Sequence, residues 1–134
     1  MSQPEIVKIN PPELHLPVDN LYTHAVSARG GTVHRIGGQV PVSASGENVA
    51  VGDMAGQLRE VYRQITIALA AAGCDWSGVV HPYTFITDMD AYLKAERQIA
   101  PAFLGSGPPA STLVQVSRLV DPEWLVEVQV DAVR

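Results

Sequence analysis

Apolar side chains along the chain are spaced by two residues in some segments and by three or four in others, which predicts strands that alternate with helices. The first segments with a period of two cover residues 22–28 and 32–36. Between them, Arg29-Gly30-Gly31 predicts the tight turn of a hairpin, because glycine adopts positive φ at little cost. The four prolines of residues 1–20 predict an extended, irregular lead-in.

Glycine and proline interrupt the strand pattern further on. Gly37 and Gly38 predict a break or bulge in the second strand. Residues 39–43 predict a further extended piece, and their proline places it at a sheet edge because it has no N–H for a ladder hydrogen bond. For the same reason, Pro82 indicates an edge position or a local irregularity in the strand predicted for 77–86.

Two segments have the period of amphipathic helices. Asp53 predicts the N-cap of a first helix that extends to about residue 72, and Gly73 predicts its end. A second helix is predicted for 89–104, with Asp88 near its start. The positions expected to be buried are Met54, Leu58, Val61, Ile65, Leu69 and Ala72 in the first helix and Tyr92, Ala95, Ile99 and Phe103 in the second.

The C-terminal part predicts a loop and then two antiparallel strands joined by a short Asp121-Pro122 turn. Successive side chains of a strand point to opposite faces. One face of the final strand is therefore apolar and belongs to the core, with Trp124, Val126, Val128, Val130 and Ala132. The other face carries Glu127, Gln129 and Asp131, so it meets water or a polar cleft.

This order of elements predicts a single α+β domain over residues 1–134, with 1–20 as an extended N-terminal lead-in. Two helices of this length cover only one face of a sheet of about five or six strands. The other face has to be buried in another way. Self-association of identical chains through this open face is the simplest solution.

Composition and charge exclude several classes of function. The nine basic residues are scattered and the formal net charge is −5, so we expect no nucleic-acid partner. No apolar run is long enough to span a bilayer and the first residues lack the features of a signal peptide, so we expect a cytoplasmic protein without a membrane partner. The lone Cys74 excludes an internal disulfide and agrees with a reducing compartment.

Six segments carry a more specific signal because they occur together, in order and at consistent spacing. They read GQVPV at 38–42, QLREV at 57–61, IALAAAG at 67–73, VV at 79–80 with TFITDM at 84–89, PASTLVQVSRL at 109–119 and LVEVQVDA at 125–132. Together they resemble the RidA/YjgF family of reactive-intermediate deaminases.

The resemblance implies a chorismate-mutase-like mixed sheet with two helices on one face, assembled as a homotrimer with clefts between subunits. It also implies hydrolysis of small enamines or imines, such as 2-aminoacrylate, to a keto acid and ammonia. The family glutamate that positions or activates water corresponds to Glu127. The tyrosine that a neighbouring subunit contributes corresponds to Tyr22.

The chain departs from the family at the motif Pro-Ala-Arg-Ser, which reads Pro109-Ala110-Ser111-Thr112 here. The family arginine holds the substrate carboxylate, and serine lacks its charge, so carboxylate affinity falls by on the order of a few kcal/mol. Leu113 replaces a cysteine of many relatives and Gly37 a serine. Together with the missing arginine, these differences imply a cleft that is less polar and less cationic. Arg35 is a candidate substitute for the missing cation, although an ordinary surface arginine is the simpler interpretation.

Each candidate residue also has a purely structural interpretation. Glu127 is either a general acid or base in a partly apolar cleft or a solvated or ion-paired strand residue. Ser111 binds substrate or water, or forms a local hydrogen bond. Tyr22 lines the cleft or caps the core.

We expect neither a metal site nor a cofactor. The four histidines lack ligand spacing, although His24 and His34 would face each other across the predicted hairpin. Cys74 has no base nearby in the sequence, which argues against a catalytic thiol.

We therefore predict a trimeric RidA-like hydrolase that acts on a small enamine, imine or related metabolite. Glu127 would handle water, while Ser111, Tyr22, Leu113 and Gly37 would form the substrate pocket. Because Ser111 replaces arginine, the substrate is not a simple amino-acid imine. The alternative is a trimer that binds or senses a small ligand without turnover. The family's historical role as ribonuclease or translation inhibitor is disfavoured by the acidic charge.

Overall fold

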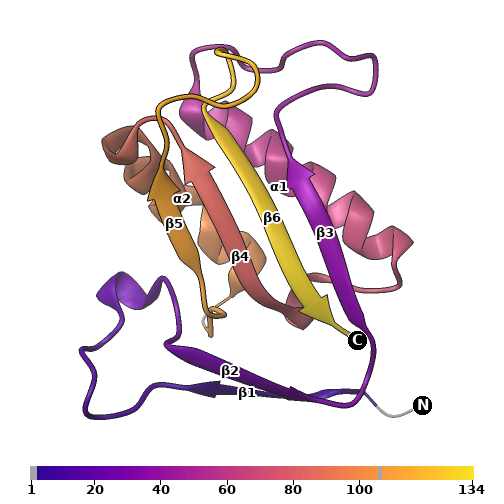
Figure 1. Cartoon of the computed structure of the whole chain (residues 1–134), viewed down its shortest axis with the longest axis vertical. Helices are drawn as coiled ribbons and strands as arrows, with labels where there is room; N and C mark the ends of the chain where they lie inside the picture. Colours follow the sequence, from indigo (N-terminus) through magenta and orange to yellow (C-terminus); the bar gives the residue numbers. More distant parts are fainter. Residues whose placement is uncertain (1–2, 106) are drawn as a thin grey trace.

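Four strands form one mixed sheet, and two helices cover one of its faces (Figure 1). The computed structural model describes residues 3–105 and 107–134. In chain order the elements are β1 (Glu5–Ile9), η1 (Val18–Asn20), β2 (Ala25–Arg29), β3 (Val33–Gln39), α1 (Met54–Ala71), η2 (Trp76–Gly78), β4 (Val79–Ile86), α2 (Met89–Leu104), β5 (Thr112–Gln115) and β6 (Val126–Val133). This arrangement confirms the predicted α+β class.

The strand order of the large sheet is β3-β6-β4-β5, so β6 and β4 are internal strands. β6 pairs antiparallel with β3 and with β4, whereas β4 pairs parallel with β5. Parallel neighbours need a crossover connection, and α2 supplies it between β4 and β5. β1 and β2 form a separate antiparallel ribbon that runs across one end of the four strands (Figure 1).

The hydrophobic core lies between the large sheet and the helices. The predicted apolar face of β6 is confirmed, because Val126, Val128 and Val130 are fully buried. They belong to the same cluster as Leu58 and Ile65 of α1. Burial stabilises each such side chain by about 1.5 to 3 kcal/mol relative to exposure. This cluster therefore holds the helices on one face of the sheet and leaves the other face for different contacts.

The first helix begins at the predicted N-cap, and Asp88, predicted near the start of the second helix, is the N-cap of α2. Asp53 accepts a hydrogen bond from the Gly56 amide at 3.0 Å, and Asp88 accepts one from the Ala91 amide at 3.1 Å. These caps satisfy N–H groups that have no partner inside the helix. Gly73 follows α1 with a φ of 75°, the left-handed conformation that ends a helix. Within the described residues, neither helix is long and apolar enough to cross a membrane.

The hairpin predicted between residues 22–28 and 32–36 is wrong. β2 pairs with β1, and β3 pairs with β6. Gly30 and Gly31 do have positive φ values of 78° and 74°, but the turn leads from one sheet to the other. The lead-in is also more regular than expected, because Glu5–Ile9 form β1. A glycine pair specifies a turn but not the partners of the strands that it joins.

The antiparallel pair predicted on either side of Asp121-Pro122 is also wrong. β5 pairs parallel with β4, and β4 lies between β5 and β6 in the sheet. β5 and β6 are therefore not paired with each other. The connection over residues 116–125 folds on itself instead. Asp121 accepts a hydrogen bond from the Glu123 amide at 2.8 Å, and Arg118 donates to two backbone carbonyls of the same loop. Asp121 and Pro122 therefore belong to a longer loop that connects β5 to β6, and not to a tight turn between paired strands.

The expectations at Pro41 and Pro82 are only partly confirmed. Pro82 lies in β4, an internal strand rather than an edge strand, and a register shift just before it is the irregularity that the sequence predicted. Gln39 ends β3, and residues 40–43 form no strand of the sheet, so the further extended piece predicted at a sheet edge is wrong. Only an isolated bridge joins Val42 to Asn48 there.

A buried glutamine connects α1 to the loop that enters β6. Gln57 is fully buried. Its amide nitrogen donates to the carbonyl of Glu123 at 2.9 Å, and its amide oxygen accepts from the backbone N–H of Leu125 at 2.7 Å. This side chain therefore holds the backbone at Leu125, immediately before β6 begins at Val126.

We expect Gln57→Ala to lower the free energy of unfolding by about 2 kcal/mol, because two backbone groups lose their partner in a poorly solvated place. Urea denaturation measures this loss. Arg59→Ala, on the exposed side of the same helix, is the matched control and should change stability by less than about 0.5 kcal/mol. Equal unfolding midpoints for the two variants would contradict the role assigned to Gln57.

Candidate functional site

A cavity of about 330 Å³ opens between the segment around η1, α2 and β5. Its apolar walls are Val18, Leu21, Leu93 and Leu113, and its polar groups are Tyr22, Glu96, Arg97 and Ser111. Three predicted substrate-binding residues, Tyr22, Ser111 and Leu113, therefore line one cavity. The structure brings them together because β5 follows α2 directly and the N-terminal segment passes beside both.

Glu96 is a cavity residue that the sequence reasoning missed. It lies one helical turn after Tyr92, a buried residue of α2. Because residues four apart are neighbours on a helix surface, this spacing was the available signal that Glu96 lies next to the buried side of α2. The side chain is half-buried, and burial raises the pKa of Glu96, while a hydrogen bond with Tyr92 and the charge of Arg97 oppose that shift. Tyr92 also makes hydrogen bonds with Thr84 and Tyr62. A polar chain thus runs from the cavity into the core.

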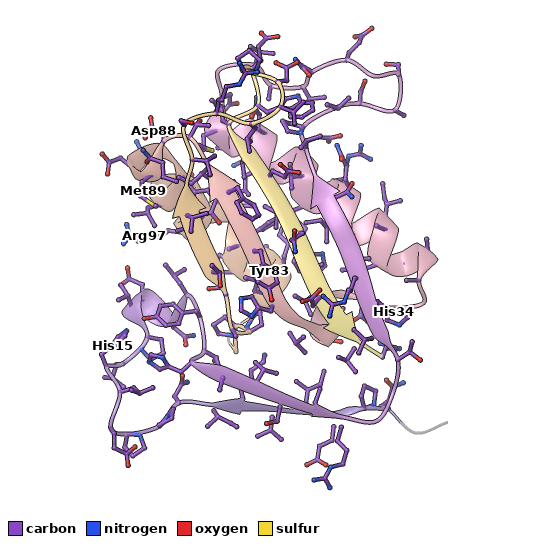
Figure 2. The ribbon with its side chains drawn as sticks, viewed as in Figure 1. His15, His34, Tyr83, Asp88, Met89 and Arg97 are labelled. Atoms are coloured by element: carbon purple, nitrogen blue, oxygen red, sulfur yellow. The ribbon has the colours of Figure 1, made fainter. Side chains whose placement is uncertain are left out.

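Arg97 lies on the rim of the same cavity but is engaged by a neighbour. Its Nη2 lies 2.9 Å from Oδ2 of Asp19 in η1, and its Nε donates to the same oxygen at 3.0 Å. Figure 2 shows Arg97 on the side of the molecule where α2 and η1 lie. The guanidinium of Arg97 is therefore paired with the carboxylate of Asp19 in the same chain.

Tyr22 is oriented by a histidine. Its hydroxyl forms a hydrogen bond with Nε2 of His15 at 2.7 Å. The ring of His24 packs edge-on against His15, with 4.8 Å between ring centroids. The expectation that His24 faces His34 is thus wrong, because β2 and β3 do not pair and His34 lies at the other edge of the large sheet (Figure 2).

Glu127 and Gly37 lie elsewhere, on β6 and β3. The carboxylate of Glu127 is half-buried against Gly38, where any Cβ would collide with it. The pairing of β3 with β6 shifts between Ile36 and Gln39, which confirms the predicted bulge. Gly38 therefore leaves room at this bulge for the carboxylate of Glu127.

The predicted site residues consequently form two separate groups within one chain. Ser111 and Leu113 belong to the β5 edge of the large sheet, whereas Gly37 lies on β3 at the opposite edge. Arg35 lies on β3 as well, where its Nη1 is 3.5 Å from Oδ1 of Asp131. It does not line the cavity of Ser111, so it does not replace the family arginine within one chain.

The sheet face that the helices leave open is partly polar and partly aromatic. Its paired residues are Asp131 with His81, Gln129 with Tyr83, and Glu127 with Phe85. The ring of His81 stacks on Tyr83 with centroids 4.1 Å apart and forms a hydrogen bond with the Thr112 hydroxyl at 2.9 Å. Burial lowers the pKa of His81, and the charge of Asp131 partly opposes this effect. Tyr83 lies over the middle strands of this face in Figure 2.

The described part of the chain contains no group of three or more His, Cys, Asp or Glu residues that would hold a metal ion. Cys74 belongs to the core instead. Burial raises the pKa of the Cys74 thiol, which disfavours the reactive thiolate.

Comparison with solved structures places this architecture in the chorismate-mutase-like class of α+β proteins. The chain is similar to a protein of unknown function of the conserved Rid protein family, YyfB from Yersinia pestis, with a TM-score of 0.88 and 28% identity over 96% of this chain and 98% of that one. Residues 14–134 match the family model described as endoribonuclease L-PSP. The chain therefore belongs to this family, the RidA/YjgF family, as the sequence segments indicated.

The chain is also similar to curated relatives of comparable length. It is 33% identical to Protein DfrA of Myxococcus xanthus, over 73% of this chain and 74% of that one. It is 29% identical to the 3-aminoacrylate deaminase RutC of Acinetobacter baylyi, over 88% of this chain and 94% of that one.

We expect Gly38→Ala to displace the Glu127 carboxylate, because the added methyl group would occupy its place. A crystal structure of the variant would show Glu127 in a different rotamer. Gly37→Ala is the matched control, since a Cβ at that position meets nothing within 4 Å and should leave Glu127 where it is. An unchanged Glu127 side chain in Gly38→Ala would show that the backbone moves instead.

Proposed function

We propose that the protein is a homotrimeric hydrolase of small enamines or imines, with an active cleft between subunits. The observation that carries this proposal is the division of the candidate residues into two groups at opposite edges of one sheet. Association through the open sheet face would place Glu127 of one subunit opposite the cavity of the next. A relative named as a 3-aminoacrylate deaminase supports the reaction class.

In this proposal Glu127 moves protons and orients water. Protonation of an enamine at carbon gives an iminium ion, and water then adds to the C=N carbon. Loss of a proton from the added water and collapse of the carbinolamine release ammonia and a carbonyl product. A half-buried carboxylate near apolar side chains is suited to these transfers. Tyr22, Ser111, Leu113 and the Gly37 backbone would form the walls of the cleft.

A trimer that binds a small ligand without turnover is the second candidate. The observation that favours it is that Tyr22 and Ser111 line a cavity of one chain whose lining does not include Glu127. A nucleic-acid substrate has less support, because the net charge of −5 would repel phosphates. The buried Cys74 fits a reducing compartment such as the cytoplasm.

Glu127→Gln should lower the turnover of any enamine or imine that the wild type hydrolyses by about 100-fold or more, because general acid or base catalysis contributes factors of this size. A coupled assay for ammonia release measures this. Binding of the same compound should change much less. A variant that hydrolyses at the rate of the wild type would exclude Glu127 from the chemistry.

Subunit mixing tests whether the cleft needs two chains. Glu127→Gln removes one half of the proposed site, and Ser111→Trp fills the other half. Co-expression of the two chains with different tags should restore activity, since about one cleft in four of a random mixed trimer contains both intact halves. If one chain supplies the whole site, the mixture stays as inactive as the separate variants.

Ser111→Arg should create activity on 2-aminoacrylate or raise it by at least about tenfold, because a guanidinium binds carboxylates bidentately. Ser111→Gln is the matched control, since it adds length and hydrogen bonding without charge. Wild-type rates equal to those of Ser111→Arg would mean that another group already holds the carboxylate.

A further inference from the structure

We propose that the cavity between η1, α2 and β5 selects a ligand with a cationic, N–H-bearing group, which Glu96 binds, and that it discriminates against carboxylates. This inference rests on the proposed function, because it names the substrate class of the same cleft. It makes Glu96 the specificity-determining residue of that cleft.

The charges around the cavity favour a cation. Glu96 and Arg97 line it, and Asp19 lies at the rim within 2.9 Å of Arg97. Two carboxylates thus accompany one guanidinium, and the guanidinium is already paired. A carboxylate ligand would compete with Asp19 for Arg97 and would meet the repulsion of Glu96. A cationic nitrogen meets the acid Glu96. The charge of Arg97 also acts on Glu96, but the guanidinium of Arg97 makes its close contact with Asp19.

The position of Glu96 is suited to ligand binding. Its side chain is half-buried, and its hydrogen bond with Tyr92 restrains it from the core side. Burial raises the pKa of Glu96, which shows that its charged form is poorly solvated. A bound N–H cation would supply the missing solvation. A charge-assisted hydrogen bond in such a place is stronger than one in water.

The rest of the cavity fits a small organic cation. The hydroxyl groups of Tyr22 and Ser111 can accept hydrogen bonds from N–H groups. Leucine and valine side chains offer an apolar wall for a short aliphatic body. Protonated imines are cations of this kind, so the same cavity would also stabilise the iminium ion that precedes attack by water.

Three probes of nearly identical shape isolate the effect of charge. Isobutyramidinium is cationic, isobutyramide is neutral and isobutyrate is anionic at neutral pH. NMR titration of the full-length protein at low salt measures their affinities, and the shifted amide signals show whether each probe binds at the cavity. We expect isobutyramidinium to bind at least about tenfold more tightly than isobutyrate, in line with one charge-assisted hydrogen bond.

Glu96→Gln should weaken isobutyramidinium binding about tenfold, while isobutyramide binding stays nearly unchanged, because glutamine keeps the shape and a hydrogen-bond acceptor but not the charge. Asp90→Asn is the matched control, since it removes one negative charge from the exposed first turn of α2, outside the cavity. Asp19→Asn should strengthen isobutyrate binding by releasing Arg97.

Several outcomes would overturn the inference. Tighter binding of isobutyrate than of isobutyramidinium to the wild type would do so, as would equal losses in Glu96→Gln and Asp90→Asn. Failure of all three probes to shift cavity signals would show that the cavity is not a ligand site.

Turnover assays keep this inference distinct from the proposed function. Selective cation binding without hydrolysis of any imine would leave the inference standing and favour the binding protein. Hydrolysis together with a preference for isobutyrate would leave the hydrolase standing and reject the role of Glu96.

Discussion

The structure depends on the alternation of side chains along β6. Because β6 has a hydrogen-bonded neighbour on each side, its side chains can point only to the two faces of the sheet. Val126, Val128 and Val130 are buried against the helices, and this burial holds the large sheet and α1 together. Glu127 is placed on the opposite face by the same geometry. A shift of the strand by one residue would expose the valines and bury the acid, so the core enforces the position of the candidate catalytic residue.

The topology then separates the candidate site into two halves. The crossover through α2 puts β5 beside β4, and β6 and β3 complete the sheet on the other side. Ser111 and Gly37 therefore belong to opposite edges, which no local rearrangement of the chain would bring together. For such a sheet, a second copy is the direct way to complete a cleft, and the face without helices is the available surface for it.

The sequence was informative where a signal is local. The caps Asp53 and Asp88, the bulge at Gly37 and Gly38, and the apolar face of β6 each depend on residues close in the chain, and the structure agrees with all of them. Strand partners were predicted less well. β2 and β3 were expected to pair because a glycine turn joins them, yet β3 pairs with β6 from the far end of the chain. Pairing is decided by global packing, which a turn does not encode.

The candidate site was also only partly predicted, because some of its residues come together only through the packing of distant segments. Tyr22, Ser111 and Leu113 were identified through the family resemblance, and they do line one cavity. Glu96 and Arg97 were missed because neither belongs to the compared motifs, and each looks like an ordinary residue on the exposed side of a helix. Only the packing of the N-terminal segment against α2 makes them part of a cavity and pairs Arg97 with Asp19.

The charge balance of this cavity gives a physical meaning to the replacement of arginine by Ser111 that we infer from the family motif. Loss of an arginine beside an isolated hydroxyl would simply weaken anion binding. Here the guanidinium of Arg97 is paired with Asp19, and the other charged group of the cavity wall is the acid Glu96. In the proposed function, the electrostatic preference of the cleft therefore changes in sign rather than only in strength. A family fold with an intact Glu127 and an inverted cavity charge is what we expect of an enzyme that keeps its water chemistry and acts on a different class of imine.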